Sequence, residues 1–300
     1  MSARRIGVVG GGTMGAGIAA ECLRAGLGVH VLSSRPASAD RARDRVLRLL
    51  DRAHAKGRID AAERADAERR AVFGADPDAL ADRDFVIEAA PEERDTKLRL
   101  FTALAKTVED PAAVLASTTS SFSITDLGNA TSRPGDVIGL HFFNPVPTMP
   151  LVEVIRSTHT TDRTARRAET LITETLGKQI VRAEDRSGFV VNALLIPYLM
   201  AAVRMYESGV ATAEDIDRGM TLGCGHPMGP LAVLDLIGLD VIAAVARSME
   251  QGTGDARHAV PPLLDRLIEE GRLGRKTGHG FHRYDTGAPA GVVADRARAS

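Results

Sequence analysis

The chain has 300 residues, 44 % of them hydrophobic, and its 38 basic and 39 acidic side chains leave a formal net charge of −1. This length can bury a large core and fits either one large domain or two domains of ordinary size. The balanced charge excludes the basic surface of a nucleic-acid-binding protein, and no apolar run reaches the roughly 18 residues that cross a bilayer. We therefore expect a cytoplasmic protein that binds neither nucleic acid nor membrane.

Cysteine and lysine are both scarce. Cys22 and Cys224 lie far apart, without the spacing of a metal or redox motif, so we expect packed thiols and no metal site. Arginine supplies most of the positive charge, so a lysine indicates a place that needs a compact ammonium. The lysines are Lys56, Lys97, Lys106, Lys178 and Lys276.

The first elements predicted along the chain form a βαβ unit. Residues 4–9 are β-branched and apolar, residues 10–15 are rich in glycine, and residues 14–25 have a helical pattern. A second strand is expected at 29–32. This order predicts a parallel sheet with right-handed crossovers.

A long polar excursion follows and then the strands return. Residues 36–72 predict a pair of helices broken near Lys56-Gly57-Arg58. Strands are expected at 85–87, 113–116, 137–140 and 179–181, with a helix over 96–107. From Phe189 to about Arg247 the pattern is helical. We predict a Rossmann-type doubly wound α/β domain with a helical hairpin insertion over 1–184, and an all-α domain over 185–300.

The glycine-rich turn has the pattern G-x-G-x-x-G, formed by Gly10, Gly12 and Gly15. These glycines allow a tight turn and a close approach of a pyrophosphate to the helix N-terminus. The motif alone is also found in unrelated turns, but its place between a strand and a helix predicts dinucleotide binding.

The second strand ends in Ser33-Ser34-Arg35, where an enzyme that prefers NAD usually has an acid. Hydroxyls and a guanidinium suit a 2′-phosphate. The alternative is that Ser33 binds the ribose while Arg35 stacks on adenine or lies in solvent. We expect NAD or NADP as cofactor, with NADP favoured.

His141 begins the segment HFFNPVP directly after the strand expected at 137–140, and Glu153 follows later in the chain. A histidine can accept a hydroxyl proton near neutral pH, and a carboxylate can orient its ring. In isolation, such a histidine is more often a core residue than a catalyst.

Several motifs together resemble the 3-hydroxyacyl-CoA dehydrogenase family, in its order and over nearly the whole chain. The bacterial 3-hydroxybutyryl-CoA dehydrogenases are the branch most similar in length. The motifs are Gly10–Gly15, Glu88-Ala89 with Glu92 and Lys97, Ser117–Ser121, HFFNPVP at 141, Glu153, Asp185–Asn192 and Gly274–Gly278.

The resemblance implies a role for each matching residue. His141 is the general base, Glu153 its orienting carboxylate, and Ser120 and Asn192 hydrogen-bond the reacting oxygen and the thioester. Lys56 falls where the family contacts CoA, although a solvated surface position explains it equally well. The glycine turn and the end of the second strand, together with the residues that match the family, give the expected cofactor-binding set: Gly10, Gly12, Thr13, Met14, Gly15, Ser33, Arg35, Ala89, Glu92, Lys97, Asn144 and Lys276.

Two departures from the family pattern concern the substrate and the cofactor. The family commonly has asparagine where this chain has Thr118, and an acid where it has Ser33. We expect hydride transfer at the 3-position of a hydroxyacyl thioester carried by CoA or a carrier protein. Free hydroxy acids such as carnitine or gulonate remain alternatives, and so does a nucleotide-binding protein without catalysis. The family also implies a homodimer formed through the helical domain.

Overall fold

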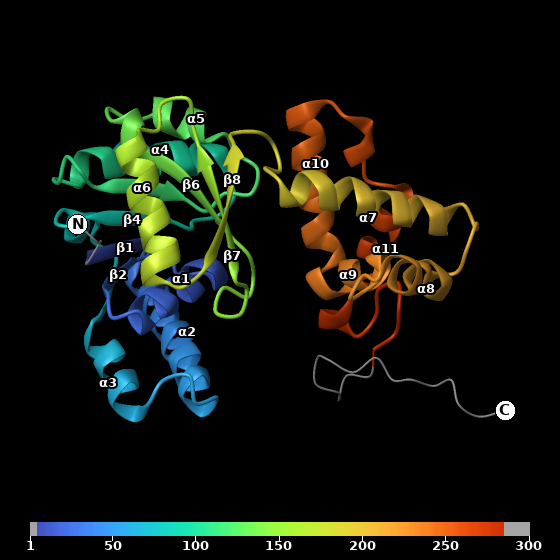
Figure 1. Cartoon of the computed structure of the whole chain (residues 1–300), viewed down its shortest axis with the longest axis horizontal. Helices are drawn as coiled ribbons and strands as arrows, with labels where there is room; N and C mark the ends of the chain where they lie inside the picture. Colours follow the sequence, from blue (N-terminus) through green and yellow to red (C-terminus); the bar gives the residue numbers. More distant parts are fainter. Residues whose placement is uncertain (1–4, 285–300) are drawn as a thin grey trace. The chain divides into compact units, whose positions relative to one another are not determined.

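The computed structural model describes residues 5–284, which divide after Val190 into two compact units. The first unit is α/β and the second is helical (Figure 1). The division lies beyond the boundary expected after residue 184 because the following segment is bonded to the first unit. There the Asp185 carboxylate accepts hydrogen bonds from the backbone N–H groups of Ile124 and Thr125 and from the Ser123 hydroxyl.

The described part of the first unit contains one eight-stranded sheet in the order β3-β2-β1-β4-β5-β6-β7-β8. Neighbouring strands are parallel except for β6 and β7, which are antiparallel. The predicted doubly wound fold is therefore confirmed. The strands are β1 (Arg5–Val9), β2 (Gly28–Leu32), β3 (Ala71–Gly74), β4 (Phe85–Glu88), β5 (Val114–Ser117), β6 (Val137–Phe142), β7 (Leu151–Arg156) and β8 (Gln179–Glu184).

Helices cover both faces of this sheet (Figure 1). One face packs its side chains against α1, α2 and α6, and the other packs against α4 and α5. Strands β4, β5 and β6 are buried along their whole length, as expected for a sheet covered on both sides. The helices are α1 (Thr13–Arg24), α2 (Pro36–Ala55), α3 (Ala61–Arg69), η1 (Pro77–Leu80), α4 (Arg94–Thr107), α5 (Ile124–Asn129), η2 (Pro134–Asp136), α6 (Asp162–Thr170) and η3 (Leu171–Thr175).

Several elements differ from the sequence prediction. The helical pair expected over 36–72 ends at Arg69, and β3 follows it, because a short strand beside a polar helix has little periodicity of its own. Strand β7 and helices α5 and α6 were not predicted. Residue 4 of the first expected strand lies outside the described residues.

The second unit has its own apolar core, built by α7, α8, α9, α10 and α11. The buried carboxylate of Asp235 on α9 accepts hydrogen bonds from the backbone N–H groups of Phe281 and His282 and from the Tyr284 hydroxyl. Among residues 5–284, no helix combines the length and apolar character needed to cross a membrane. The helices are α7 (Val191–Glu207), α8 (Ala213–Cys224), α9 (Pro230–Ile237), α10 (Leu239–Thr253), η4 (Ala256–His258), α11 (Pro262–Glu269) and η5 (Arg275–Thr277).

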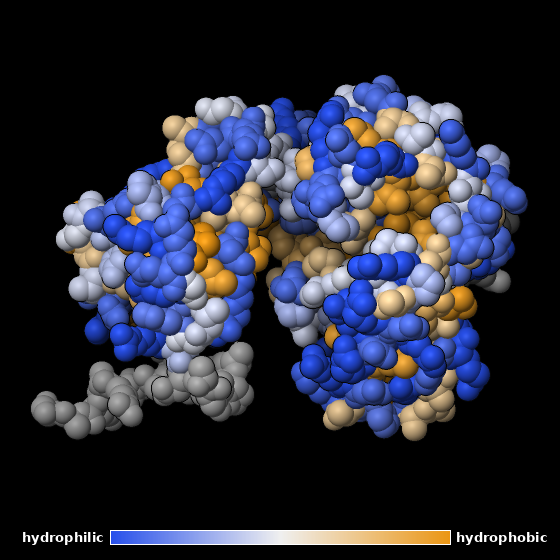
Figure 2. All heavy atoms as spheres, turned by 180° about the vertical axis from the view of Figure 1, so that it is seen from behind, coloured by the Kyte–Doolittle hydropathy of each residue, from blue (hydrophilic) through white to orange (hydrophobic). Residues whose placement is uncertain are grey.

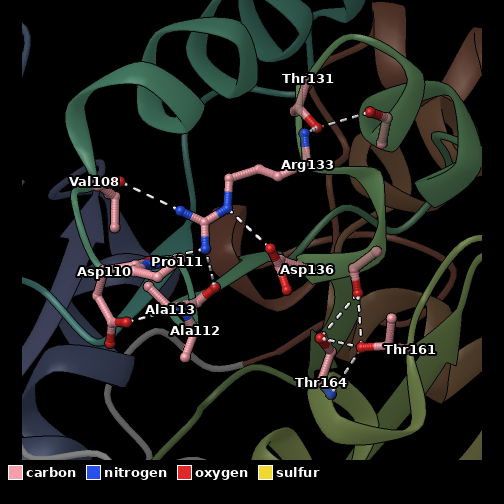
Figure 3. Close-up of polar contacts among 12 residues, drawn as sticks. Val108, Asp110, Pro111, Ala112, Ala113, Thr131, Arg133, Asp136, Thr161 and Thr164 are labelled. Atoms are coloured by element: carbon pink, nitrogen blue, oxygen red, sulfur yellow. Dashed lines mark hydrogen bonds and ion pairs between the residues drawn. The ribbon is translucent and has the colours of Figure 1, made fainter.

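Arg133 connects the loops that lead into β5 and β6 by hydrogen bonds (Figure 3). Its guanidinium donates to the carbonyls of Val108, Asp110 and Ala113 at 3.3, 2.9 and 3.0 Å. Its Nε donates to the Asp136 carboxylate at 3.0 Å. This network fixes the amino ends of two central strands, whose carboxyl ends carry the candidate site.

Candidate functional site

The turn between β1 and α1 is shaped by its glycines. Gly10 has a φ of 104°, and a Cβ there would lie 2.6 Å from the Ala89 carbonyl oxygen. A Cβ at Gly15 would clash with the Gly10 carbonyl, whereas one at Gly12 would meet nothing within 4 Å. The turn is therefore packed tightly against β4 and open on its outer side. No acidic residue or capping side chain occupies the first turn of α1, so its N–H groups can receive an anion.

The carboxyl end of β2 lies beside this turn. Ser33 is buried, and its Oγ has no hydrogen-bond partner among the described residues. A Cβ built on Gly11 would approach that Oγ to 3.3 Å, which places the unused hydroxyl at the turn. Arg35 is exposed at the start of α2. An unsatisfied hydroxyl next to an open glycine turn fits the ribose and phosphates of a dinucleotide.

His141 and Glu153 are directly paired residues of the antiparallel strands β6 and β7. His141 Nδ1 lies 2.6 Å from Glu153 Oε2, and both side chains are buried. The second carboxylate oxygen accepts the backbone N–H of Val190 at 3.0 Å. The rings of Phe143 and Phe189 lie 4.7 and 5.6 Å from the imidazole. The strand pairing therefore holds the imidazole and carboxylate together in an apolar setting.

Strand alternation explains which face of the sheet carries these groups. Glu88 and Ser117 have the same parity as Val86 and Leu115, which pack beneath α4 and α5. Glu153 shares its parity with Ile155 of the same cluster, and its partner is His141. Polar residues at the carboxyl ends of β4, β5 and β6 thus point to one face of the sheet.

Lys97 and Glu88 form a buried ion pair at this edge. The Lys97 ammonium lies 2.8 Å from Glu88 Oε1, with side-chain exposures of 1 % and 0 %. The other Glu88 oxygen accepts the Ser117 hydroxyl at 2.6 Å. Lys97 also lies 3.1 Å from Glu92 Oε2. The Lys97 ammonium is therefore directed to two carboxylates within the fold.

Glu92 organises the serine-rich turn after β5. Its Oε1 accepts the backbone N–H of Ser120 and the Ser121 hydroxyl, both at 3.0 Å, together with the Thr119 hydroxyl at 2.5 Å. Burial alone would raise the pKa of Glu92, but Lys97 and the hydroxyl donors outweigh it and lower that pKa below its usual value. Glu92 thus remains an acceptor that fixes the backbone at Ser120.

A pocket of about 270 Å³ lies between α1, α2 and the loop after β6. Arg45, Arg48 and Arg52 of α2 give it positive charge, and we call it the arginine-lined pocket. Arg45 also donates to the Gly11 carbonyl at 3.0 Å. The remaining lining residues are Thr13, Ala16, Gly17, Leu49, Asn144, Pro145, Val146 and Pro147.

Other residues expected in the site occupy different surroundings. Lys56 is exposed just after α2 and does not line the arginine-lined pocket. Asn192 and Lys276 belong to the second unit. There the Lys276 ammonium lies 2.5 and 2.7 Å from the two Asp240 carboxylate oxygens.

Several residues that the structure brings to the site have no clear signal in the sequence. Thr119, Ser121 and Glu88 lie within quoted motifs, but their hydrogen bonds depend on neighbouring strands. Phe189 has a positive φ of 50°, which a helix-like pattern does not indicate. The arginines of α2 were part of a generally basic helix. Their spacing at intervals of three and four residues places them on one helix face, and this spacing could have indicated a shared positively charged surface.

Family models match both parts of the chain. Residues 5–186 match the NAD binding domain of 3-hydroxyacyl-CoA dehydrogenase, and residues 188–284 match its C-terminal domain. The chain belongs to the 3-hydroxyacyl-CoA dehydrogenase family. It is accordingly a nicotinamide-dependent dehydrogenase of that type, acting on a CH–OH group.

Individual members of the 3-hydroxyacyl-CoA dehydrogenase family match almost end to end. The 3-hydroxybutyryl-CoA dehydrogenase of Mycobacterium tuberculosis is 47 % identical over 94 % of this chain and 98 % of its own. The crystal structure of FadB2 from the same species has a TM-score of 0.91 at 46 % identity, covering 95 % of this chain and 100 % of that one. The Ralstonia eutropha (S)-3-hydroxybutyryl-CoA dehydrogenase structure has a TM-score of 0.88 at 40 % identity, with coverages of 95 % and 100 %.

Proposed function

We propose that this enzyme transfers a hydride between a nicotinamide cofactor and the 3-position of a 3-hydroxyacyl or 3-ketoacyl thioester, with 3-hydroxybutyryl-CoA as the type substrate. The names of its relatives support the substrate class. The observation that carries the proposed chemistry is the buried His141–Glu153 pair, with 2.6 Å between Nδ1 and Oε2.

His141 is the general acid and base of this proposal. With Nδ1 directed to Glu153, the other ring nitrogen, Nε2, can accept the proton of the substrate 3-hydroxyl. Positive charge then grows on the imidazole, and the adjacent carboxylate stabilises it more in the transition state than in the ground state. In the reducing direction, the same nitrogen returns the proton to the carbonyl oxygen.

The residues of the glycine turn would hold the cofactor, which when bound supplies the atom that accepts or gives the hydride. Gly10, Gly12, Thr13, Met14 and Gly15 form the phosphate-binding turn, and Ser33 offers its unused hydroxyl to the ribose. Because β2 is followed by Ser33 and Arg35 and not by an acid, we propose that NADP(H) is accepted and preferred.

Further residues complete the proposed site. Ser120 and Asn192 hydrogen-bond the reacting oxygen and the thioester end, with Ser120 placed by its backbone bond to Glu92. Lys97 contributes to the cofactor site indirectly, because its ammonium is directed to Glu88 and Glu92. Ala89, Asn144 and Lys276 are the remaining residues proposed to contact the nicotinamide half of the cofactor.

The arginine-lined pocket favours CoA over a free hydroxy acid. Its three arginines can neutralise phosphate groups, which a CoA thioester carries and carnitine or gulonate lacks. The phosphate-bearing part of CoA would serve as the handle by which the enzyme holds the thioester. Lys56, at the C-terminal end of α2, would add positive charge at the outer end of this handle. A phosphopantetheine arm on a carrier protein also has a phosphate, so it is the main alternative to CoA.

We also propose a cytoplasmic homodimer formed through the second unit. This unit exposes Leu194, Val210, Leu222 and Val241, which are 72, 71, 75 and 45 % exposed. The face of this unit that is visible in Figure 2 carries hydrophobic surface. Large exposed apolar patches mark protein interfaces, and light scattering on the purified protein measures the oligomeric state.

A substrate screen tests the proposed reaction. Acetoacetyl-CoA, longer ketoacyl-CoA thioesters and ketoacyl groups on a carrier protein are reduced with NADH or NADPH, and carnitine and gulonate are oxidised with NAD or NADP, all followed by absorbance. We expect turnover of the CoA thioesters. His141→Ala should lower kcat by about 10²- to 10⁴-fold with cofactor binding retained, whereas the exposed His159→Ala control should not. Normal turnover by His141→Ala contradicts the proposal.

A further inference from the structure

Lys178 is a buried lysine with no part in the proton relay. It lies just before β8, and its side chain is 6 % exposed. Its ammonium donates to the carbonyls of Val146 and Met149 at 2.7 and 2.8 Å. The carboxylate of Glu21 on α1 lies 3.8 Å away. A positive charge is thus directed to the backbone of the loop after β6.

The loop that receives these hydrogen bonds forms one wall of the arginine-lined pocket, through residues 144–147. The N–H groups of Thr148 and Met149 bond to the Pro145 carbonyl, which closes the loop on itself. On the other side the loop packs on α1, where a Cβ at Gly17 would lie only 2.9 Å from the Val146 Cβ. Two side chains from outside the loop donate to its other carbonyls: Lys178 bonds to Val146 and Met149, and Arg58 bonds to Pro147 at 3.2 Å.

We propose that Lys178 is a positioning residue for this dehydrogenase, fixing loop 144–149 so that the arginine-lined pocket keeps the shape that receives the phosphate-bearing handle of the thioester. The inference rests on the proposed function for its ligand. It rests on contacts within the first unit for its geometry.

The chemistry of the contact explains why this position has a lysine in an arginine-rich chain. The buried Val146 carbonyl and the partly buried Met149 carbonyl accept from nearly the same point, and a compact ammonium with three rotatable donors can bond to both. A planar guanidinium directs its donors along fixed, diverging lines. Glu21 offsets the cost of burying the charge and is itself paired with Arg24 at 2.5 Å.

Hydrogen exchange measured by mass spectrometry tests the contact between Lys178 and loop 144–149 without an activity assay. We compare the wild-type chain with Lys178→Met, which removes the donors but keeps the length of the side chain. The double variant Glu21→Gln/Lys178→Met removes both charges of this pair, so that the buried Glu21 carboxylate is not left facing an apolar side chain. In both we expect exchange at Thr148 and Met149 to rise by about tenfold or more, with the amides of α1 unchanged. Lys106→Met, at an exposed lysine of α4, is the control.

Steady-state kinetics tests the consequence for the substrate. In the double variant we expect KM for the CoA thioester to rise about tenfold, with kcat and cofactor KM within about threefold, because binding of the handle precedes the chemistry. Unchanged loop exchange and unchanged KM overturn the inference, and so does a uniform rise of exchange throughout the first unit. Absence of thioester turnover in the wild type contradicts the proposed function instead, while the loop exchange still reports on Lys178.

Discussion

Glu153 and His141 face each other across the β6–β7 ladder, and the carboxylate is fixed from its other side by the Val190 N–H. The orientation of the imidazole is therefore set by the register of β6 and β7 and by the backbone of Val190 at the end of the first unit. A substitution of the carboxylate can test its electrostatic role with little change in side-chain shape.

Glu153→Gln should lower kcat by about 100-fold and leave the cofactor Kd within about twofold. Glutamine preserves the volume but cannot stabilise an imidazolium, so the loss falls on the transition state. Stopped-flow or steady-state absorbance gives kcat, and calorimetry gives Kd. The exposed Glu174→Gln is the matched control. If kcat remains within threefold of the wild type, the carboxylate is not part of the proton relay.

Arg35→Ala should raise KM for NADPH by about tenfold and change KM for NADH by less than twofold. The exposed guanidinium can pair with a 2′-phosphate, which NADH lacks. Steady-state kinetics with both cofactors measures the ratio, and Arg41→Ala on the exposed surface of the same helix is the control. A wild-type enzyme that strongly prefers NADH, with the same preference in Arg35→Ala, refutes the NADP(H) assignment.

Arg133→Met should lower the free energy of unfolding by about 3 kcal/mol. The substitution leaves the carbonyls of Val108, Asp110 and Ala113 without the guanidinium donor, while Asp136 keeps its ion pair with Arg163 at 2.7 Å. Urea denaturation followed by circular dichroism measures the change. The exposed Arg166→Met should change stability by less than about 0.5 kcal/mol. Equal stabilities of the two variants would show that the network in Figure 3 contributes little.

His282 should make the stability of the second unit depend on pH. Its Nε2 lies 2.8 Å from Asp217 Oδ2, and this hydrogen bond raises the pKa of His282 above its ordinary value. The stabilisation is fully present below the unfolded pKa of about 6.5 and is lost as pH rises through the raised folded pKa. We expect the thermal midpoint to fall across this interval in the wild type, and to fall less in His282→Gln. His159→Gln, at an exposed position, should follow the wild type; parallel curves for all three proteins would contradict the linkage.

Patterns within single segments of the sequence were enough to predict the βαβ opening, the glycine turn, the placement of His141 at a strand end and the helical character of the C-terminal part. Each of these depends on local signals: periodicity, glycine spacing and burial along a single segment. The residues that resemble the 3-hydroxyacyl-CoA dehydrogenase family implied roles for individual side chains, and those roles are proposals. Strand β7 was missed because the sequence between 151 and 156 does not show which neighbour it will pair with.

The contacts between these residues depend on how the strands and helices pack together. The reversal of β7 places Glu153 directly opposite His141, and burial directs the Lys97 ammonium to Glu88 and Glu92. The same packing gathers the α2 arginines beside the loop that Lys178 bonds. Register and burial arise from contacts between segments far apart in the chain, so the pattern within any one segment does not contain them.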